Sequence, residues 1–205
     1  MPDEIIEDEV RLLAAIAYGE ASIEDNENEI SGIAYAAANR ARAWGGRSIK
    51  KMIDDDPNYT YAANGSNVRF NLLNRSSASD IEKSKAMSIA IKKAKEALAG
   101  SGTDPSNGAY WWDGVDFKTN YTNHPKVLKG FKYGDASHNI FGVDEKTKTV
   151  VLYWKVKDKK TGQEVNSKER GRYDHVFVST AAHGKTIFWK FNPDYIRATG
   201  AKAYK

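Results

Sequence analysis

The chain of 205 residues contains no cysteine, so disulfides, thiol catalysis and zinc sites built from cysteine are all excluded. It also contains no apolar run near the roughly 20 residues that a membrane-spanning helix needs. Residues 1–9 are acidic, whereas a secretory signal peptide is basic and then apolar. We therefore expect no membrane insertion and no signal peptide, and predict a domain excised from a longer protein or delivered by other means.

Familiar cofactor and catalytic motifs are missing too. The glycine-rich segments match neither a phosphate-binding loop nor a dinucleotide fingerprint, and no Gly-x-Ser-x-Gly elbow supports Ser/His/Asp catalysis. The four histidines lack the spacing of metal ligands, so we expect structural roles for His124, His138, His175 and His183. The sequence thus predicts neither a cofactor nor a metal site.

The net charge of +4 conceals a strong asymmetry. Residues 1–29 contain ten Asp or Glu and one Arg, a net charge of −9, so residues 30–205 carry +13. A basic body with one acidic corner suits an anionic polymer to which it presents carboxylates. Nucleic acid and peptidoglycan, which is anionic through its peptide carboxylates, both fit, and charge alone does not choose between them.

The composition, 40% hydrophobic and 28% charged, is typical of a globular domain, and the length fits one domain over 1–205. Apolar periodicity and capping residues predict helices at 3–20, 27–44, 48–53 and 79–98, with a loop at 58–77. Aromatic and β-branched runs predict strands at 150–156, 173–179 and 185–191, with a polar hairpin at 157–171. We therefore predict an α+β fold that is mainly α: a helical part at 1–100, then an aromatic loop and a small antiparallel β element at 101–205.

Glu20 breaks the apolar pattern of the first helix. Ile6, Val10, Leu13 and Ala17 recur at three- and four-residue steps, and the next position of this stripe is Glu20. Such local exceptions tend to mark functional sites. Partial burial and the negative end of the helix dipole both disfavour a charged carboxylate there. We therefore expect a raised pKa, which suits a general acid, against the alternative of a solvated glutamate at a helix end.

Glu29 has the opposite setting, in the first turn of the second helix, where the dipole favours an ionised carboxylate. A protonated carboxyl group beside a charged one is the pair that glycosidases use. The segment Asn26-Glu-Asn-Glu29 also matches a capping box, in which Asn26 caps the helix and Glu29 reaches back to it. A catalytic and a purely structural role for Glu29 are therefore both open.

Two segments, Tyr18-Gly-Glu-Ala-Ser22 and Gly32-Ile-Ala-Tyr-Ala-Ala-Ala-Asn-Arg40, resemble the signature of SleB-like cell-wall hydrolases. There a helix ends in a catalytic Glu and the next carries an Ala-rich face ending in Asn-Arg, which implies a catalytic Glu20 and adds Asn39 as a substrate-binding residue. The Glu20/Glu29 pair and the layout are also similar to lysozyme-like C-terminal domains of TseP-like type VI secretion effectors. The resemblance implies a lysozyme-like fold. Thr186 stands where the SleB-like pattern has His.

An aromatic segment at 107–114 offers flat apolar faces beside hydrogen-bonding groups, as sugar rings require. In the SleB-like group a similar segment lines the glycan groove, which implies substrate contacts for Tyr110, Trp111, Trp112 and Asp113. Base stacking on single-stranded nucleic acid would use the same rings, and one of the tryptophans is expected to belong to the core. Tyr61, in the loop at 58–77, is a further candidate because long loops are often functional.

Together these features predict a lysozyme (muramidase), a glycoside hydrolase that cuts peptidoglycan between N-acetylmuramic acid and N-acetylglucosamine. Glu20 would protonate the leaving oxygen, while Glu29 activates water or stabilises the oxocarbenium-like transition state. We expect a monomeric antibacterial effector that is secreted without its own signal peptide. It would act in the periplasm or cell wall of a target bacterium and be matched by a cognate immunity protein.

Three alternatives stay open. A lytic transglycosylase of the same fold needs one Glu and leaves an anhydro product, and the same fold could act on chitin. A non-catalytic basic module would grip glycan or single-stranded nucleic acid through Tyr110, Trp111 and Trp112, and would need no acid at Glu20. We favour hydrolysis of peptidoglycan, with no role for nucleic acid.

Overall fold

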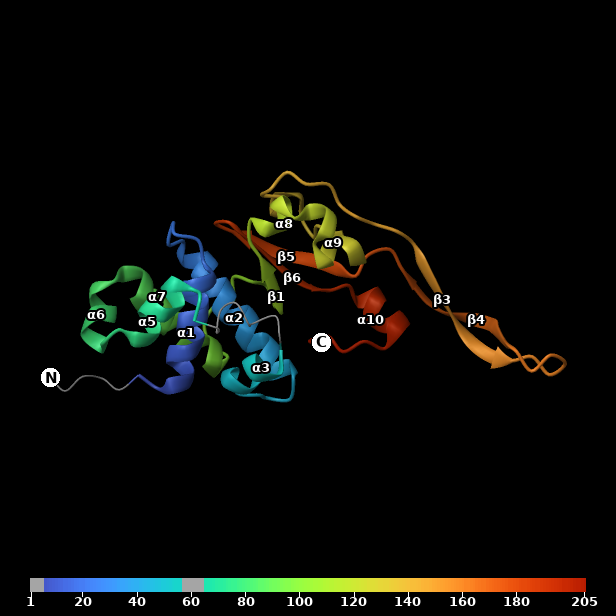
Figure 1. Ribbon diagram of the computed structural model, residues 1–205, viewed down its shortest axis with the longest axis horizontal. Coiled ribbons are helices and arrows are strands. Elements are labelled where there is room, and N and C mark those ends of the chain that lie inside the picture. The colour runs from blue at the N-terminus through green and yellow to red at the C-terminus, as the bar shows by residue number, and fades with distance from the viewer. Residues whose placement is uncertain (1–5, 57–64) are drawn as a thin grey trace.

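The computed structural model describes residues 6–56 and 65–205, so the predicted substrate contact Tyr61 lies outside the described residues. The N-terminal half is helical (Figure 1). Its helices are α1 (Asp8–Glu20), α2 (Glu27–Ala43), α3 (Ile49–Asp55), α5 (Val68–Arg75), α6 (Ala78–Lys83) and α7 (Lys85–Ala99). Among the helices in these ranges, none has the length and apolar character that a membrane crossing requires.

The C-terminal half contains two sheets and three short α-helices. Its strands are β1 (Trp111–Asp113), β2 (Phe131–Lys132), β3 (Val150–Lys157), β4 (Glu164–Tyr173), β5 (Phe177–His183) and β6 (Thr186–Phe191). Its helices are α8 (Asp116–Thr119), α9 (Pro125–Lys129) and α10 (Pro193–Thr199). One sheet has the order β1-β6-β5-β2, with β2 parallel to β5 and the other pairs antiparallel, while β3 and β4 form a separate ribbon.

The prediction of a mainly α fold with a small β element is wrong. Of the residues that the structure describes, 46% are helical and 19% lie in strands, with a four-stranded mixed sheet, so this is a mixed α/β fold. Two of the strands that sequence reasoning missed, β1 and β2, have three and two residues, too short to show an alternating pattern. The third, β4, lies in the predicted polar hairpin, and its side chains are mostly exposed, so it carries no apolar alternation.

The helical predictions hold best where a helix is long and amphipathic. Helices α1, α2 and α3 lie where they were expected within the described residues, and Gly100 ends α7 in the left-handed conformation. The predicted helix at 79–98 is two helices, because the Ser84 side chain accepts a hydrogen bond from the Met87 amide and starts α7 anew. Part of the predicted loop at 58–77 is α5, which begins with Asn67 as its cap.

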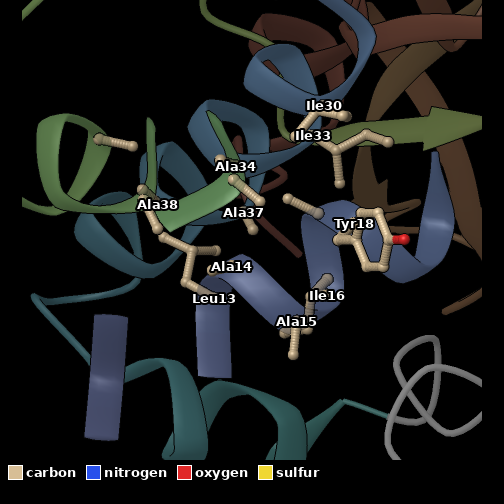
Figure 2. Packing of buried hydrophobic residues seen from close by; sticks show 14 of the residues in the cluster. Leu13, Ala14, Ala15, Ile16, Tyr18, Ile30, Ile33, Ala34, Ala37 and Ala38 are labelled. Atoms are coloured by element: carbon tan, nitrogen blue, oxygen red, sulfur yellow. The ribbon is translucent and has the colours of Figure 1, made fainter. Parts of the chain in front are cut away.

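A first hydrophobic cluster joins α1, α2 and α7 and is rich in alanine (Figure 2). A second cluster, rich in aromatic residues, fills the space between the four-stranded sheet and the short helices around it. The two meet where α2 crosses the sheet. A Cβ atom on Gly32 would lie 2.5 Å from the Phe188 ring, so only glycine permits this approach. The close crossing brings the first turn of α2 to the start of β6.

Candidate active site

A cavity of about 590 Å³ opens where the end of α1 and the start of α2 meet β1, α8 and β6. Glu20 and Glu29, predicted from the sequence as a pair, both line it. The other lining residues are Ser22, Trp112, Gly114, Val115, Asp116, Lys185 and Thr186. Residues from the N-terminal helices and from the C-terminal sheet therefore build one site, although they lie far apart in the sequence.

Glu20 is the last residue of α1 and is partly buried. Burial raises the pKa of its carboxyl group, and the negative charge of Asp116 acts in the same direction. Hydrogen bonds from the Trp112 and Asn67 side chains oppose this shift without cancelling it, and the Asn67 amide lies 3.4 Å from Glu20 Oε1. The predicted direction of the shift is thus the one that the structure supports.

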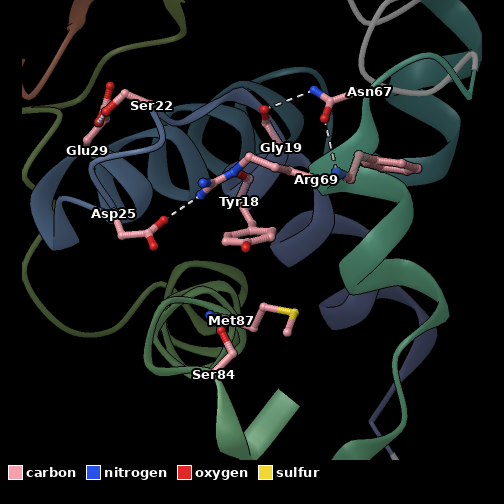
Figure 3. Close-up of polar contacts among 10 residues, drawn as sticks. Tyr18, Gly19, Ser22, Asp25, Glu29, Asn67, Arg69, Ser84 and Met87 are labelled. Carbon is pink, nitrogen blue, oxygen red and sulfur yellow. Dashed lines mark hydrogen bonds and ion pairs between the residues drawn. The ribbon is translucent and has the colours of Figure 1, made fainter. Parts of the chain in front are cut away.

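The segment before Glu20 is held in place by α5 (Figure 3). Asn67 caps α5 and also donates to the Gly19 carbonyl oxygen at 2.9 Å. Arg69 Nε donates to the Tyr18 carbonyl oxygen at 2.8 Å, and its guanidinium group pairs with Asp25 at 2.6 Å. These contacts satisfy carbonyl groups that the end of α1 leaves without a helical partner, and so fix the orientation of Glu20. Sequence reasoning missed them, although Asn67 has the spacing of a cap for Phe70.

Glu29 has no exposed surface, and donors surround its carboxyl group. Oε2 accepts a hydrogen bond from Ser22 Oγ at 2.6 Å, and Oε1 accepts from Thr186 Oγ1 at 2.8 Å and from the Lys185 amide at 3.1 Å. Asn26 caps α2 as predicted, by accepting from the Glu29 amide at 3.0 Å. The other half of the predicted capping box is replaced, because the carboxyl group is directed to β6. Three donors of this kind stabilise a carboxylate.

Asp116 is a lining carboxylate that sequence reasoning missed. It is the first residue of α8, and its side chain is 66% exposed. The His124 ring, whose Nε2 lies 3.7 Å from Asp116 Oδ2, holds the pKa of this carboxyl group below its ordinary value. Asp116 is therefore an ionised and accessible carboxylate in the same cavity as Glu20. No local pattern marks it, since its partner His124 is eight residues away, beyond the end of α8.

Asp113, predicted as a substrate contact, belongs instead to a charged cluster behind Asp116. His124 Nε2 lies 3.3 Å from Asp113 Oδ1, and Lys126 Nζ lies 2.9 Å from Asp113 Oδ2. Burial lowers the pKa of His124, but Asp113 and Asp116 outweigh it and raise the pKa to about 9. The Lys126 amide donates to His124 Nδ1 at 3.3 Å, and an accepting Nδ1 cannot carry a proton. At this length the hydrogen bond is weak, and the two carboxylates outweigh it. His124 is thus a protonated partner of two carboxylates at neutral pH.

Asp113, Asp116 and His124 also form the one group in the described part of the chain that could hold a metal ion, with ligand atoms within 4.8 Å of one another. A cation there would displace the Lys126 ammonium group from Asp113 and the proton from His124. The present charges already neutralise both carboxylates. The cluster therefore fits an ion-pair network better than a metal site.

The aromatic segment divides between the cavity and the core. Trp112 lines the cavity and donates a hydrogen bond to Glu20, as a substrate-contacting residue would allow. Trp111 is directed to the other side of β1, where its ring packs 4.5 Å from that of Phe191 in the second cluster. The Tyr110 ring lies edge-on to Trp111 at 5.9 Å and is not among the residues that line the cavity. One tryptophan at the site and one in the core agrees with the expectation for this pair.

Asn39 also lies away from the cavity. Its side-chain amide donates to Asp104 Oδ2 at 2.8 Å and to the Ala109 carbonyl oxygen at 3.3 Å, which ties α2 to the segment before β1. Its neighbour Arg40 is buried, pairs with Asp56 and stacks 5.2 Å from Trp111. The Asn-Arg end of the Ala-rich helix therefore holds the structure together, while the predicted contact of Asn39 with substrate has no support from its position.

Thr186 completes the geometry of the site. It is buried at the start of β6, and its hydroxyl group is one of the three donors to Glu29. Gly184 in the preceding turn has φ +57°, and a Cβ atom there would lie 2.4 Å from Glu29 Oε2.

A comparison of the chain with protein-family models, curated proteins and solved structures gives no match.

Proposed function

We propose that this protein hydrolyses the glycan strand of peptidoglycan, with Glu20 as the general acid. The observation that carries this proposal is a carboxyl group of raised pKa in a cavity that also holds the ionised carboxylate of Asp116. A group of this kind stays protonated nearer to neutral pH and can give its proton to a leaving glycosidic oxygen. The resemblance of the segments around Glu20 to SleB-like hydrolases supports peptidoglycan as the polymer.

The second carboxylate of the reaction is Asp116 in this proposal, and Glu29 organises the site. A general base must reach a water molecule, and a charge that stabilises an oxocarbenium-like transition state must face the sugar. Asp116 has both the exposure and the ionisation for either role. Glu29 lines the same cavity, but it is fully buried and already accepts three hydrogen bonds. A catalytic Glu29, expected from the sequence, is the alternative that mutation tests.

Trp112 has two functions in this scheme. Its indole group hydrogen-bonds to Glu20, and this contact fixes the carboxyl group in the cavity. Because the residue lines the same cavity, it can also contact a sugar ring. Lys185 lies at the same rim, where its exposed ammonium group pairs with Glu24 at 2.7 Å and can also meet the carboxylates of the stem peptides. The charge of Lys185 favours an anionic glycan over a neutral one such as chitin, whereas Trp112 suits either.

Delivery and partners follow the same resemblance. The similarity to TseP-like effectors makes this protein a candidate antibacterial effector that acts in the periplasm or cell wall of a target bacterium. A producing cell would then need an immunity protein that covers the cavity. Both ideas depend on the hydrolase activity and are secondary to it.

The test is digestion of purified peptidoglycan by the wild type and by Glu20→Gln, with mass spectrometry of the released fragments. Reducing disaccharide peptides from the wild type alone are the expected result. Anhydro fragments would keep Glu20 as the acid but change the reaction to transglycosylation. No release by a folded wild-type protein, or equal release by both proteins, would overturn the proposal and favour a non-catalytic binding module.

A further inference from the structure

Strands β3 and β4 form an arm that extends far from the rest of the molecule (Figure 1). Its base is fixed, because Gly171 packs so closely on α10 that a Cβ atom there would lie 2.8 Å from the Ala198 Cβ, and Arg170 donates to the Thr199 carbonyl oxygen at 2.9 Å. Beyond the base, every residue from 153 to 170 except Asp158 is exposed. The arm is thus a two-stranded ribbon that no other layer covers.

The tip of the arm is an ordered turn. Asp158 Oδ1 accepts hydrogen bonds from the Lys160 amide at 2.9 Å and from the Thr161 amide at 2.8 Å, and Gly162 adopts φ +71°. The Asp158 amide in turn donates to the Gln163 carbonyl oxygen at 2.8 Å. The closed turn and the regular pairing from Lys155–Asn166 to Lys157–Glu164 give the outer part of the ribbon a defined shape, while the register shifts lie nearer the base, between Leu152 and Lys155.

Large apolar side chains are exposed along this ribbon. Trp154 is 49% exposed and Val156 is 48% exposed, and Val156 pairs across the strands with Val165, which is 41% exposed. The guanidinium group of Arg170 lies 4.9 Å from the centre of the Trp154 ring. Two-stranded ribbons are marginally stable on their own. A partner that covers the exposed apolar side chains removes them from water, which stabilises both the ribbon and the complex. The arrangement is typical of a binding element.

The arm is also strongly basic. Residues 150–173 contain seven Lys or Arg and three Asp or Glu, so their net charge of +4 equals that of the whole chain. Two of the acidic side chains are engaged within the arm: Asp158 holds the turn, and Glu169 forms a paired contact with Arg172 at 2.6 Å. The charge that remains for a partner is therefore strongly positive, and its complement is a polyanion.

We propose that the β3–β4 arm binds a strand of anionic cell-wall glycan at a second contact, separate from the cavity. Trp154 would stack on a sugar ring while the neighbouring lysines meet the carboxylates of the stem peptides. The choice of polymer rests on the proposed function, because the cavity of the same molecule is assigned to this glycan. An arm that holds the insoluble polymer keeps the cavity close to new bonds after each cleavage.

Binding is measured by co-sedimentation with purified peptidoglycan sacculi, in the Glu20→Gln background so that the polymer stays intact. One variant changes Lys157, Lys159 and Lys160 to Gln, and a second carries Trp154→Ala. The matched controls change the exposed Lys50, Lys85 and Lys92 to Gln, and Leu128 to Ala, all outside the arm. We expect each arm variant to bind on the order of tenfold more weakly, equivalent to about 1.4 kcal/mol, and the controls to bind as before.

Equal losses in the arm and control variants, or no loss in either, would overturn the proposal. The same proteins are also tested on double-stranded DNA. Arm variants that lose DNA binding while they keep sacculus binding would identify the partner as nucleic acid instead. The outcome is independent of catalysis: if the wild-type protein, with Glu20 intact, cleaves no peptidoglycan but the arm variants still lose sacculus binding, the hydrolase proposal fails and the arm proposal stands.

Discussion

Thr186 Oγ1 donates a hydrogen bond to Glu29 Oε1 at 2.8 Å, between two buried residues that are 157 positions apart in the sequence. This contact links the first turn of α2 to the start of β6. The Lys185 amide donates to the same oxygen at 3.1 Å, so the Glu29 carboxyl group holds the turn before β6 in place. Glu29 is therefore a structural junction between the two halves of the fold, whatever its share in catalysis.

Removal of the Thr186 hydroxyl group should destabilise the protein. Thr186→Val keeps the shape of the side chain but leaves a buried carboxylate with one donor fewer. We expect the free energy of unfolding to fall by about 1 to 3 kcal/mol, measured by urea denaturation. Thr186→Ser, which retains the hydroxyl group, is the control and should lose less. Equal losses for Val and Ser would show that the methyl group, and not the hydrogen bond, is what matters.

Glu20→Gln should lose activity and gain stability. The raised pKa means that the folded state disfavours the charged carboxylate, so a neutral amide should increase the free energy of unfolding at pH 7 by about 0.5 to 2 kcal/mol. The rate of glycan cleavage should fall on the order of 10³-fold because the proton donor is gone. Chemical denaturation and the digestion assay are run on the same preparation. A destabilised variant would contradict the account of the Glu20 environment.

Asp116→Asn and Glu29→Gln should separate a catalytic from a structural role. We expect Asp116→Asn to lower kcat by about 100-fold or more and to lower the melting temperature less than Glu29→Gln does, because the side chain is exposed and gives up only its contact with His124. Glu29→Gln should lower the melting temperature, since Gln cannot accept all three hydrogen bonds in the same way. The reverse pattern would return the catalytic role to Glu29.

The Asp116 charge should also be visible in the titration of Glu20. Because Asp116 raises the pKa of the Glu20 carboxyl group, Asp116→Asn should lower that pKa. Carbon-13 NMR of the side-chain carboxyl groups measures this directly, without a need for activity. In the wild type, cleavage should decline as the pH rises through the raised pKa of Glu20. An unchanged Glu20 titration in Asp116→Asn would place the two groups too far apart to interact.

His124 should make the free energy of unfolding fall as the pH rises into the alkaline range. Its pKa is about 9 in the folded protein and 6.5 as an ordinary side chain, so between these values the folded state holds a proton that the unfolded state has lost. The contribution is fully present below pH 6.5 and disappears as the pH rises through 9, with a total of up to about 3 kcal/mol. Urea denaturation from pH 6 to 9.5 measures it.

His124→Gln should remove most of this pH dependence, because the ring is the group that gains the proton. His138→Gln is the matched control: burial lowers the pKa of His138, so this residue has no part in the loss of stability above pH 6.5. If both variants keep the wild-type slope, another group is responsible and the charged cluster around His124 has a different protonation state.

Local patterns identified the parts of the site that local structure builds. Glu20 follows from a helical apolar stripe, and Asn26 from its position before α2, because both signals lie within a few residues. Asp116, His124 and Thr186 carry no such signal. Their roles depend on contacts made across loops or between the ends of the chain, and a single sequence does not contain that geometry.

The fold shows the same division. Long amphipathic helices such as α2 were predictable, since their burial imposes a period that the sequence repeats several times. Strands β1 and β2 are too short for a period, and β4 is exposed on a ribbon, where burial selects no pattern. The sequence therefore predicted a mainly helical fold, because its helices carry a visible period and these strands do not, and the number of strands was underestimated.

The long separation between Glu29 and Thr186 in the sequence also has a consequence for synthesis. The ribosome makes Glu20 and Glu29 early, but two of the three donors to Glu29 come from residues 185 and 186. Trp112 and Asp116, which set the environment of Glu20, are made more than ninety residues after it. A nascent chain whose β6 has not yet emerged from the ribosome thus has Glu20 and Glu29 without the cavity around them. Whatever chemistry the cavity performs therefore begins only after β6 has been made.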